Sequence, residues 1–179
     1  LRCPTLPGCT RTGSQQRSDV RFHRACELVR NGRIGKLQAI HVRLPVDSGF
    51  GRADISEVPS HFNYPMWLGP TPELPYAIDR VHPLQGYSRP GWLQIESYCR
   101  GMITGWGAHM FDTAQWGHGS DDGGPVEIRA TADFPTRGLF NVHTQFHAEG
   151  RYADGVRLFA DSGDPAGVRF EGDAGSTHV

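Results

Sequence analysis

The stretch GMITGWGAHMFDTAQWGHG, residues 101–119, is the segment around which the rest of the chain can be arranged. Its apolar positions recur at three- and four-residue spacing, the pattern of one helix face. These positions are Ile103, Trp106, Met110, Ala114 and Gly117. The spacing predicts a helix over about residues 106–116.

Candidate chemistry on this helix is carried by His109 and Asp112, which stand three residues apart and therefore share a face. An imidazole and a carboxylate at this spacing are close enough to share a proton or a ligand. The same spacing is also typical of a purely structural pair. Gly101, Gly105 and Gly107 would let the backbone approach a ligand where the helix begins. The pattern suggests a site without indicating a reaction.

Length and charge limit the number of domains and the classes of partner that the chain can have. At 179 residues the chain is long enough for one sizeable core and too short for two ordinary domains, so we expect one domain. The formal net charge is -1, from 18 basic and 19 acidic residues, and favours neither nucleic acid nor an anionic membrane as a partner. The 23 glycines and 13 prolines predict that much of the chain is loop.

The four cysteines, Cys3, Cys9, Cys26 and Cys99, form no CxxC pair and no zinc-type spacing with histidine, so no metal site is expected. A reduced, cytoplasmic protein is the default, although Cys3 and Cys9 could close a small loop in an oxidising compartment. No signal-peptide core or long apolar run is present in the sequence. Because the chain starts with Leu, we expect a fragment or a processed product.

The N-terminal part predicts a lead-in, a helix and a strand. Residues 1–17 are polar and typical of a loop. A helix should follow Ser18 as its N-cap and stop at Asn31 and Gly32, with His23 on its surface. Residues 36–45 alternate and are rich in β-forming residues, which predicts a half-buried strand.

Residues 46–90 show little periodicity and combine many prolines with many aromatic side chains. A structureless insert of this length is unusual in a compact domain unless it is a binding loop. Solvated linkers are poor in Trp, Tyr and Phe, whereas sugar and nucleotide sites present flat apolar faces. We therefore interpret the segment as an aromatic binding loop.

The C-terminal part predicts strands over residues 126–135, 140–146, 151–152 and 156–161, with a hairpin turn at 153–155 and a last strand from 166. His143 and His147 fall in this region, where strand composition favours a structural role over metal binding. The order of elements predicts an α+β fold, an open-faced, mostly antiparallel sheet with helices on one face. We expect the other face to be apolar and to seal a dimer.

Five runs, in this order along the chain, carry a resemblance to a known family. They are TGSQQRSDVRFHRACELVRNGRIGKL, NYPMWLGPTPELPY, RPGW, GMITGWGAHMFDTAQWG and GVRFEG. Together they closely resemble the glucose-fructose oxidoreductase/inositol dehydrogenase/MocA (Gfo/Idh/MocA) family of nicotinamide-dependent sugar oxidoreductases. The likeness extends over nearly the whole chain from about Thr12.

The resemblance implies a domain division. Family members begin with a Rossmann domain that carries a Gly-rich phosphate loop and an EKP-type motif with a catalytic lysine. Neither motif occurs in this sequence, so we expect the Rossmann domain to be missing and the chain to be truncated. Residues 1–17 would be a lead-in remnant of the nucleotide-binding half, and 18–179 the substrate and dimerisation domain, with its aromatic Pro-rich loop at 46–90.

The resemblance also implies site residues. His109 matches the family's active-site histidine, with Asp112 beside it, but Gly105 occupies the position where the family usually has an acidic residue. In the loops around the pocket, the implied cofactor contact is Gln15, and the implied substrate contacts are Gln16, Arg17, Trp67 and Arg89.

The resemblance implies that the chain is the substrate-binding and oligomerisation domain of an NAD(P)-dependent oxidoreductase acting on a sugar or polyol. NAD or NADP is implied by the family, and we expect this chain alone not to bind it. Two alternatives remain open. One is a cofactor-independent carbohydrate lyase or hydrolase that uses His109 with Asp112 or Glu96, and the other is a non-catalytic assembly module.

Overall fold

The computed structural model describes residues 13–82 and 90–179. The elements of the first half are η1 (Gln15–Ser18), α1 (Val20–Arg30), β1 (Leu37–Leu44), α2 (Tyr64–Leu68), α3 (Ile78–Val81) and η2 (Gly91–Gln94). Those of the second half are η3 (Gly101–Ile103), α4 (Trp106–His118), β2 (Glu127–Asp133), β3 (Gln145–Arg151), β4 (Arg157–Ser162), β5 (Gly167–Gly172) and β6 (Ser176–His178). None of the described helices is long and apolar enough to cross a membrane.

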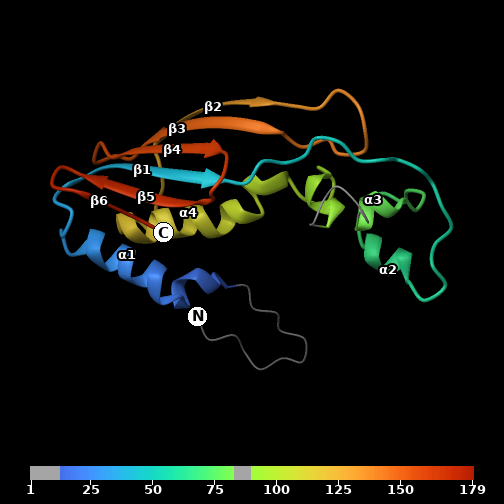
Figure 1. The fold of residues 1–179 in the computed structure, drawn as a ribbon, viewed down its shortest axis with the longest axis horizontal. Helices are drawn as coiled ribbons and strands as arrows, with labels where there is room; N and C mark the ends of the chain where they lie inside the picture. Colours follow the sequence, from blue (N-terminus) through green and yellow to red (C-terminus); the bar gives the residue numbers. More distant parts are fainter. Residues whose placement is uncertain (1–12, 83–89) are drawn as a thin grey trace.

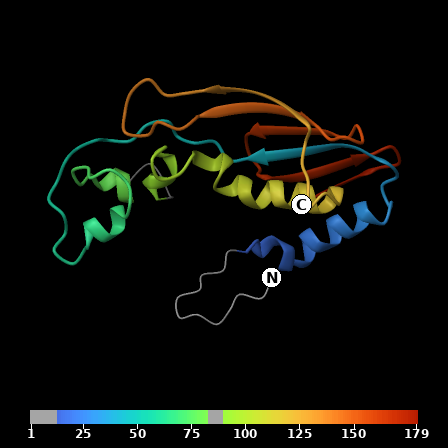
Figure 2. The ribbon, with the colours of Figure 1, turned by 180° about the vertical axis from the view of Figure 1, so that it is seen from behind.

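The six strands form one sheet in the order β2-β3-β4-β1-β5-β6. Strand β1 runs parallel to β4, and the other neighbours are antiparallel. Helix α4 packs against one face of this sheet, and α1 packs against α4 on the same side (Figures 1 and 2). The predicted fold class, a mostly antiparallel open sheet with helices on one face, is confirmed.

The main core lies between the sheet and α4. Alternate residues of β1, namely Ile40, Val42 and Leu44, point to this side and are buried. Helix α4 contributes Met110 and Ala114, and the strands contribute further apolar side chains to the same cluster. Alternate residues along β1 and residues three to four apart along α4 face each other here, so the apolar side chains of both elements are buried in one layer.

The central helix is confirmed and ends two residues later than predicted, at His118. Helix α1 is also confirmed, but its N-cap is Asp19 rather than Ser18, because Ser18 is the last residue of η1. The Asp19 carboxylate accepts a hydrogen bond of 2.8 Å from the backbone N–H of Arg21. The short helical turn η1 also replaces the loop expected at the end of the lead-in.

Strand prediction succeeds for β1, β2, β4 and β5, and for the turn at 153–155, where Gly155 has a φ of 93°. The strand expected over 140–146 is largely wrong, since β3 begins at Gln145. Before β3, the backbone bonds to a segment outside the sheet. The N–H of Asn141 donates to the carbonyl of Gln94, and its side-chain Oδ1 accepts from the N–H of Glu96. Strand β6 was not predicted.

The segment 46–90 is not a structureless loop where it is described. It contains α2, α3 and a bridge between Ile55 and Ala77. Phe62, Tyr64, Trp67 and Tyr76 pack on one another in a second cluster, separate from the main core, whereas Phe50 is exposed. We call this set the aromatic cluster: Tyr64, Leu68 and Tyr76 are buried, with Phe62, Trp67, Ile78, Val81 and Tyr98 packed against them. The rings therefore stabilise this segment, and its role as a binding loop stays a prediction.

The open face of the sheet is charged, so the expectation of an apolar face is wrong. On β3 and β4, the imidazole of His147 lies 2.6 Å from the Asp161 carboxylate, and Arg157 lies 3.7 Å from Glu149. On β1 and β5, His41 lies 3.2 Å from Glu171. The apolar residues of these strands point to α4, and alternation leaves the charged ones outside. The dimer through this face stays a prediction, and polar rather than apolar contacts would have to hold it.

Candidate functional site

His109 lies near the N-terminal end of α4 and is half-buried. Its ring meets the Trp106 ring edge-on, with 5.7 Å between centroids. The Nδ1 atom is buried and finds no hydrogen-bond partner within residues 13–82 and 90–179. A buried polar atom without a partner is costly unless something else satisfies it. Of the predicted pair, His109 is therefore the residue with a ring nitrogen that the described residues leave without a hydrogen bond.

Asp112 faces Arg17 in a two-pronged contact. The Arg17 Nε donates to Oδ2 of Asp112 and Nη2 donates to Oδ1, both at 2.8 Å. The same Nη2 reaches Oδ1 of Asp121 at 2.7 Å, and the guanidinium lies 5.4 Å from the centroid of the Trp116 ring. This geometry joins η1 to α4 by charge-assisted hydrogen bonds.

Electrostatics keep the Asp112 carboxylate ionised. Its hydrogen bonds from Arg17 lower its pKa more than partial burial raises it, and the Ser14 side chain lowers the pKa further. The two carboxylates raise the pKa of Arg17 in turn. A negative charge thus stands one helical turn from His109, although the structure described shows no hydrogen bond between the two side chains.

The residues of η1 differ in their surroundings. Gln15 is exposed, whereas Gln16 is buried and its Oε1 has no hydrogen-bond partner among the described residues. Arg17 is engaged by two carboxylates, so its guanidinium is already neutralised. The structure thus brings Arg17 and Asp112 together on one side of α4.

Trp67 belongs to the aromatic cluster. It stacks on Tyr64 with 5.6 Å between centroids and contacts Tyr98 at 5.3 Å. Figure 1 shows its helix, α2, beyond the N-terminal end of α4, away from η1. Arg89, the other loop residue expected at the pocket, lies outside the described residues. Glu96, the alternative acid, is exposed and lies 3.0 Å from Arg100.

A buried polar pair that sequence reasoning missed lies just before α4. The Oδ2 atom of Asp47 accepts the N–H of Met102 at 2.8 Å, and Nδ1 of His143 stands 3.7 Å from the same oxygen. Both residues are buried. The hydrogen bond to Met102 fixes the turn η3 that leads into α4, which gives Asp47 a structural role. No local pattern marks Asp47, because its partners are distant in sequence.

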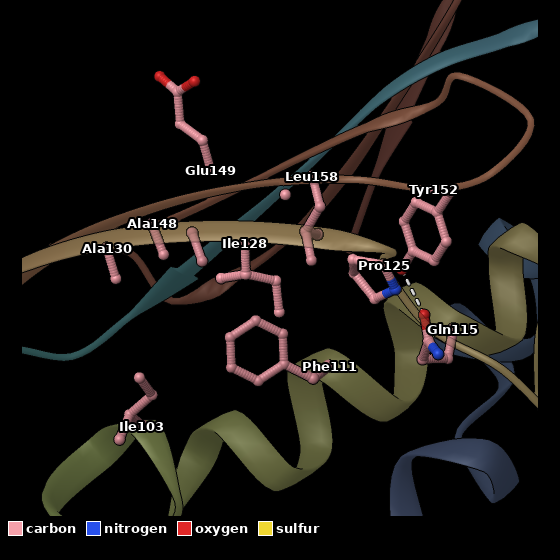
Figure 3. A pocket seen from close by; sticks show the side chains of 12 residues that line it. Ile103, Phe111, Gln115, Pro125, Ile128, Ala130, Ala148, Glu149, Tyr152 and Leu158 are labelled. Carbon is pink, nitrogen blue, oxygen red and sulfur yellow. Dashed lines mark hydrogen bonds between the residues drawn. The ribbon is translucent and has the colours of Figure 1, made fainter.

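An apolar groove of about 410 Å³ lies between α4 and the outer strands of the sheet (Figure 3). Phe111 and Ile103 point up from the helix side, and Ile128, Ala130 and Ala148 point down from the strands. Tyr152 donates a short hydrogen bond to Gln115 at one end. With so few polar groups the groove is poorly suited to a sugar, so it is distinct from the His109 site.

Metal ligation finds no support in the part of the chain that is described. No group of three or more His, Cys, Asp or Glu residues there could hold a metal ion. His147 on β3 makes its contacts with Asp161 and Glu149, which fits the expectation of a surface role.

Comparison with known proteins decides the family. Residues 44–177 match the Gfo/Idh/MocA family model described as "Oxidoreductase family, C-terminal alpha/beta domain". This chain belongs to the Gfo/Idh/MocA oxidoreductase family. The match includes β2 to β5 and the central helix, so the resemblance drawn from the five sequence runs is confirmed. No curated protein matches the chain.

Solved structures of Gfo/Idh/MocA-like oxidoreductases share the fold at low sequence identity. GenD2 from gentamicin A biosynthesis, in complex with NAD, has a TM-score of 0.58 and 15% identity, covering 93% of this chain and 38% of its own. The myo-inositol dehydrogenase from Corynebacterium glutamicum gives 0.54 and 15%, covering 93% and 39%. The aldose-aldose oxidoreductase from Caulobacter crescentus, complexed with glycerol, gives 0.57 and 16%, covering 93% and 39%. The chain therefore spans about two fifths of the length of these proteins.

Proposed function

We propose that this chain is the substrate-facing domain of an NAD(P)-dependent oxidoreductase that acts on a sugar or polyol, with His109 at the substrate hydroxyl. Membership of the Gfo/Idh/MocA family supports the oxidoreductase assignment. Neighbours named as a myo-inositol dehydrogenase and an aldose-aldose oxidoreductase support the substrate class. The observation that carries the proposal is the half-buried His109 ring, whose Nδ1 has no partner among the described residues.

Oxidation of an alcohol needs a group that takes the hydroxyl proton while hydride leaves the same carbon. His109 fits the proton-transfer role, since an imidazole can accept a proton near neutral pH. The ionised Asp112 carboxylate stands three residues further along the same helix. Arg17 would act by fixing the Asp112 carboxylate rather than by touching the substrate.

The described residues do not by themselves fit a nicotinamide nucleotide. The sequence contains no G-x-G-x-x-G fingerprint, and Gln15 is exposed on η1. We therefore expect weak binding of NAD(P) to this chain alone. We also retain the division into a lead-in, residues 1–17, and a substrate domain, 18–179, as part of the proposal.

Replacement of His109 by Ala tests the site. We expect His109→Ala to weaken binding of myo-inositol or glucose about tenfold or more, through loss of the imidazole's polar contact with the ligand. Because Nδ1 has no protein partner to lose within the described structure, the melting temperature should change little. Isothermal titration calorimetry and thermal melts followed by circular dichroism would measure the two effects, and NAD would be titrated in parallel.

His23→Ala is the matched control, because this histidine is exposed on α1 and its ring contacts only Trp116 among the ring contacts described. It should leave binding unchanged. A stability loss of about 1–3 kcal/mol in His109→Ala with unchanged sugar binding would mean that His109 is a core residue. A dissociation constant for NAD below about 10 μM would contradict the expectation of weak cofactor binding.

A further inference from the structure

The side of α4 that carries His109 is covered by α1 and η1 along much of its length. Near the C-terminal end of the helix, the ring of Trp116 packs edge-on against a histidine ring of α1, with 5.5 Å between centroids. One turn earlier, Asp112 accepts two hydrogen bonds from Arg17 of η1. Trp106 and His109 continue the same side at three-residue spacing, and α4 extends past η1 here (Figures 1 and 2). The first turn of α4, where Trp106 is exposed, lies beyond this cover.

Trp106 has no place in the hydrophobic core. It is 40% exposed, whereas the other three tryptophans, all within the described residues, are more buried. The apolar spacing along the sequence groups Trp106 with Met110 and Ala114, but only the last two belong to the main core. The buried residues of α4 begin at Gly107, directly after it. Core packing therefore does not account for a tryptophan at this position.

The rings of Trp106 and His109 form two walls of a corner on the surface of α4. Their planes are inclined by 63°, and their centroids are 5.7 Å apart. The indole is a flat apolar surface, and the imidazole beside it can donate or accept a hydrogen bond. Small-molecule sites combine aromatic surface with a few polar groups that fix the orientation of the ligand. The corner thus offers both kinds of contact to one ligand.

A cyclic sugar or cyclitol has the shape and polarity that this corner requires. Its hydroxyl groups project around the rim of the ring, while the C–H groups on its faces form apolar patches. A ring that lies with one face on the indole of Trp106 can direct a rim hydroxyl toward His109. An open-chain polyol carries the same groups but holds no fixed apolar face, so it would lose more conformational freedom to make the same contacts.

We propose that Trp106 is the stacking surface for the substrate and makes the site prefer a cyclic sugar or cyclitol to an open-chain polyol. This preference rests on the proposed function, in which His109 meets the substrate hydroxyl, and it narrows the substrate class. Trp67, which the resemblance implied as a substrate contact, stacks on Tyr64 and contacts Tyr98. The exposed indole of Trp106 instead lies beside the imidazole at which the reacting hydroxyl would be held.

Calorimetric titration with glucose, myo-inositol and the open-chain polyol sorbitol tests this preference. The wild-type chain should bind both cyclic ligands more tightly than sorbitol. Trp106→Ala should raise the dissociation constants for glucose and myo-inositol about tenfold or more and that for sorbitol less than about twofold, because only a stacked ring loses its surface. Trp106→Phe keeps a flat ring and should weaken glucose binding less than about threefold. Circular dichroism melts would confirm that Trp106→Ala is folded, as the exposure of Trp106 predicts.

Tryptophan fluorescence gives a readout that a purely structural role of Trp106 would not move. Glucose should change the emission of the wild-type chain but not that of Trp106→Phe. The matched control is Trp116→Phe, because Trp116 lies on the same side of α4 and packs against α1. This variant should keep both the emission change and the affinity for glucose.

The outcomes separate the role of Trp106 from the proposed function. Unchanged glucose binding in Trp106→Ala, together with weaker binding in His109→Ala, would overturn the stacking role and leave the proposed function standing. Equal losses for glucose and sorbitol in Trp106→Ala, or a wild-type chain that binds sorbitol as tightly as glucose, would overturn the preference for a ring. A wild-type chain that binds none of the three ligands would overturn both the stacking role and the proposed function.

Discussion

At the scale of single residues, the contact between Arg17 and Asp112 connects the start of the described chain to the central helix. Both oxygens of Asp112 accept hydrogen bonds from the guanidinium, whose planar fork matches a carboxylate. The helical spacing of His109 and Asp112 is visible in the sequence, and it correctly places both on α4. Their different roles were not predictable, because Arg17 is 95 residues away from Asp112.

Asp112→Asn should destabilise the fold by about 1–2 kcal/mol, because an amide cannot accept both charge-assisted bonds and the pair is partly screened by solvent. The pKa of Asp112 is lowered in the folded state. The stabilisation is therefore present above the unfolded pKa of about 3.9 and is lost as pH falls through the lower folded value. Urea unfolding at pH 7 and at about pH 3 would show the difference between variant and wild type shrinking in acid.

Asp121→Asn is the control for this contact. Asp121 accepts from the same Nη2 of Arg17 but is more exposed, so its loss should cost less than about 1 kcal/mol. Equal losses in both variants, or a difference that does not shrink with acid, would contradict the role given to Asp112.

At the scale of elements, the approach of α4 to the sheet depends on Gly117. A Cβ atom at this position would lie 2.4 Å from ring atoms of Phe170, which is fully buried on β5. Gly117→Ala gains about 0.8–1.0 kcal/mol of helix propensity but forces an overpacked contact that costs about 1–3 kcal/mol. Because the ring of Phe170 is fully buried and would have to shift, we expect a net loss of stability of about 1–2 kcal/mol, measured by denaturant unfolding.

Gly123→Ala provides the comparison, since Gly123 is exposed and a Cβ there would meet nothing within 4 Å. It should change stability by less than about 0.5 kcal/mol. A Gly117→Ala chain as stable as wild type would mean that α4 can shift away from β5 without cost.

The elements predicted correctly from the sequence are those whose apolar pattern lies within the element itself. Helix α4 and strand β1 each show their own pattern of burial, so their existence follows from the sequence. The strand expected over residues 140–146 was wrong at 141 and 142, because their backbone N–H groups donate to the carbonyl of Gln94 rather than to a strand. Four aromatic residues of the described part of 46–90, Phe62, Tyr64, Trp67 and Tyr76, pack on one another, which agrees with the prediction that this segment is not a solvated linker.

At the scale of the whole molecule, the sheet order could not be read from the chain. The parallel pairing of β1 with β4 places Ala39 beside Arg157, and all of the aromatic cluster and α4 intervene in sequence. Such pairings depend on the total burial of the assembled core and leave no short-range signal. The charged open face is likewise visible only after the register is known, because register decides which alternate residues point outward.

Two separate hydrophobic clusters predict that the molecule does not open as one unit. Tyr76 is buried in the aromatic cluster and meets Tyr64 edge-on at 5.3 Å, with no part in the main core. Tyr76→Ala should remove about 3 kcal/mol or more from this cluster, which is small enough to be lost entirely. Hydrogen exchange followed by mass spectrometry should then show fast exchange across α2 and α3, while the amides of β1, β4 and α4 keep their protection.

Leu158→Ala supplies the opposite case, because Leu158 is buried on β4 in the main core. Its loss, about 2–5 kcal/mol, should lower protection across the sheet and α4. If Tyr76→Ala instead lowered protection of the sheet as much as that of α2 and α3, the two clusters would form one cooperative unit. Independent opening would mean that the aromatic segment can rearrange beyond the N-terminal end of α4 while the strands and helix that hold His109 stay in place.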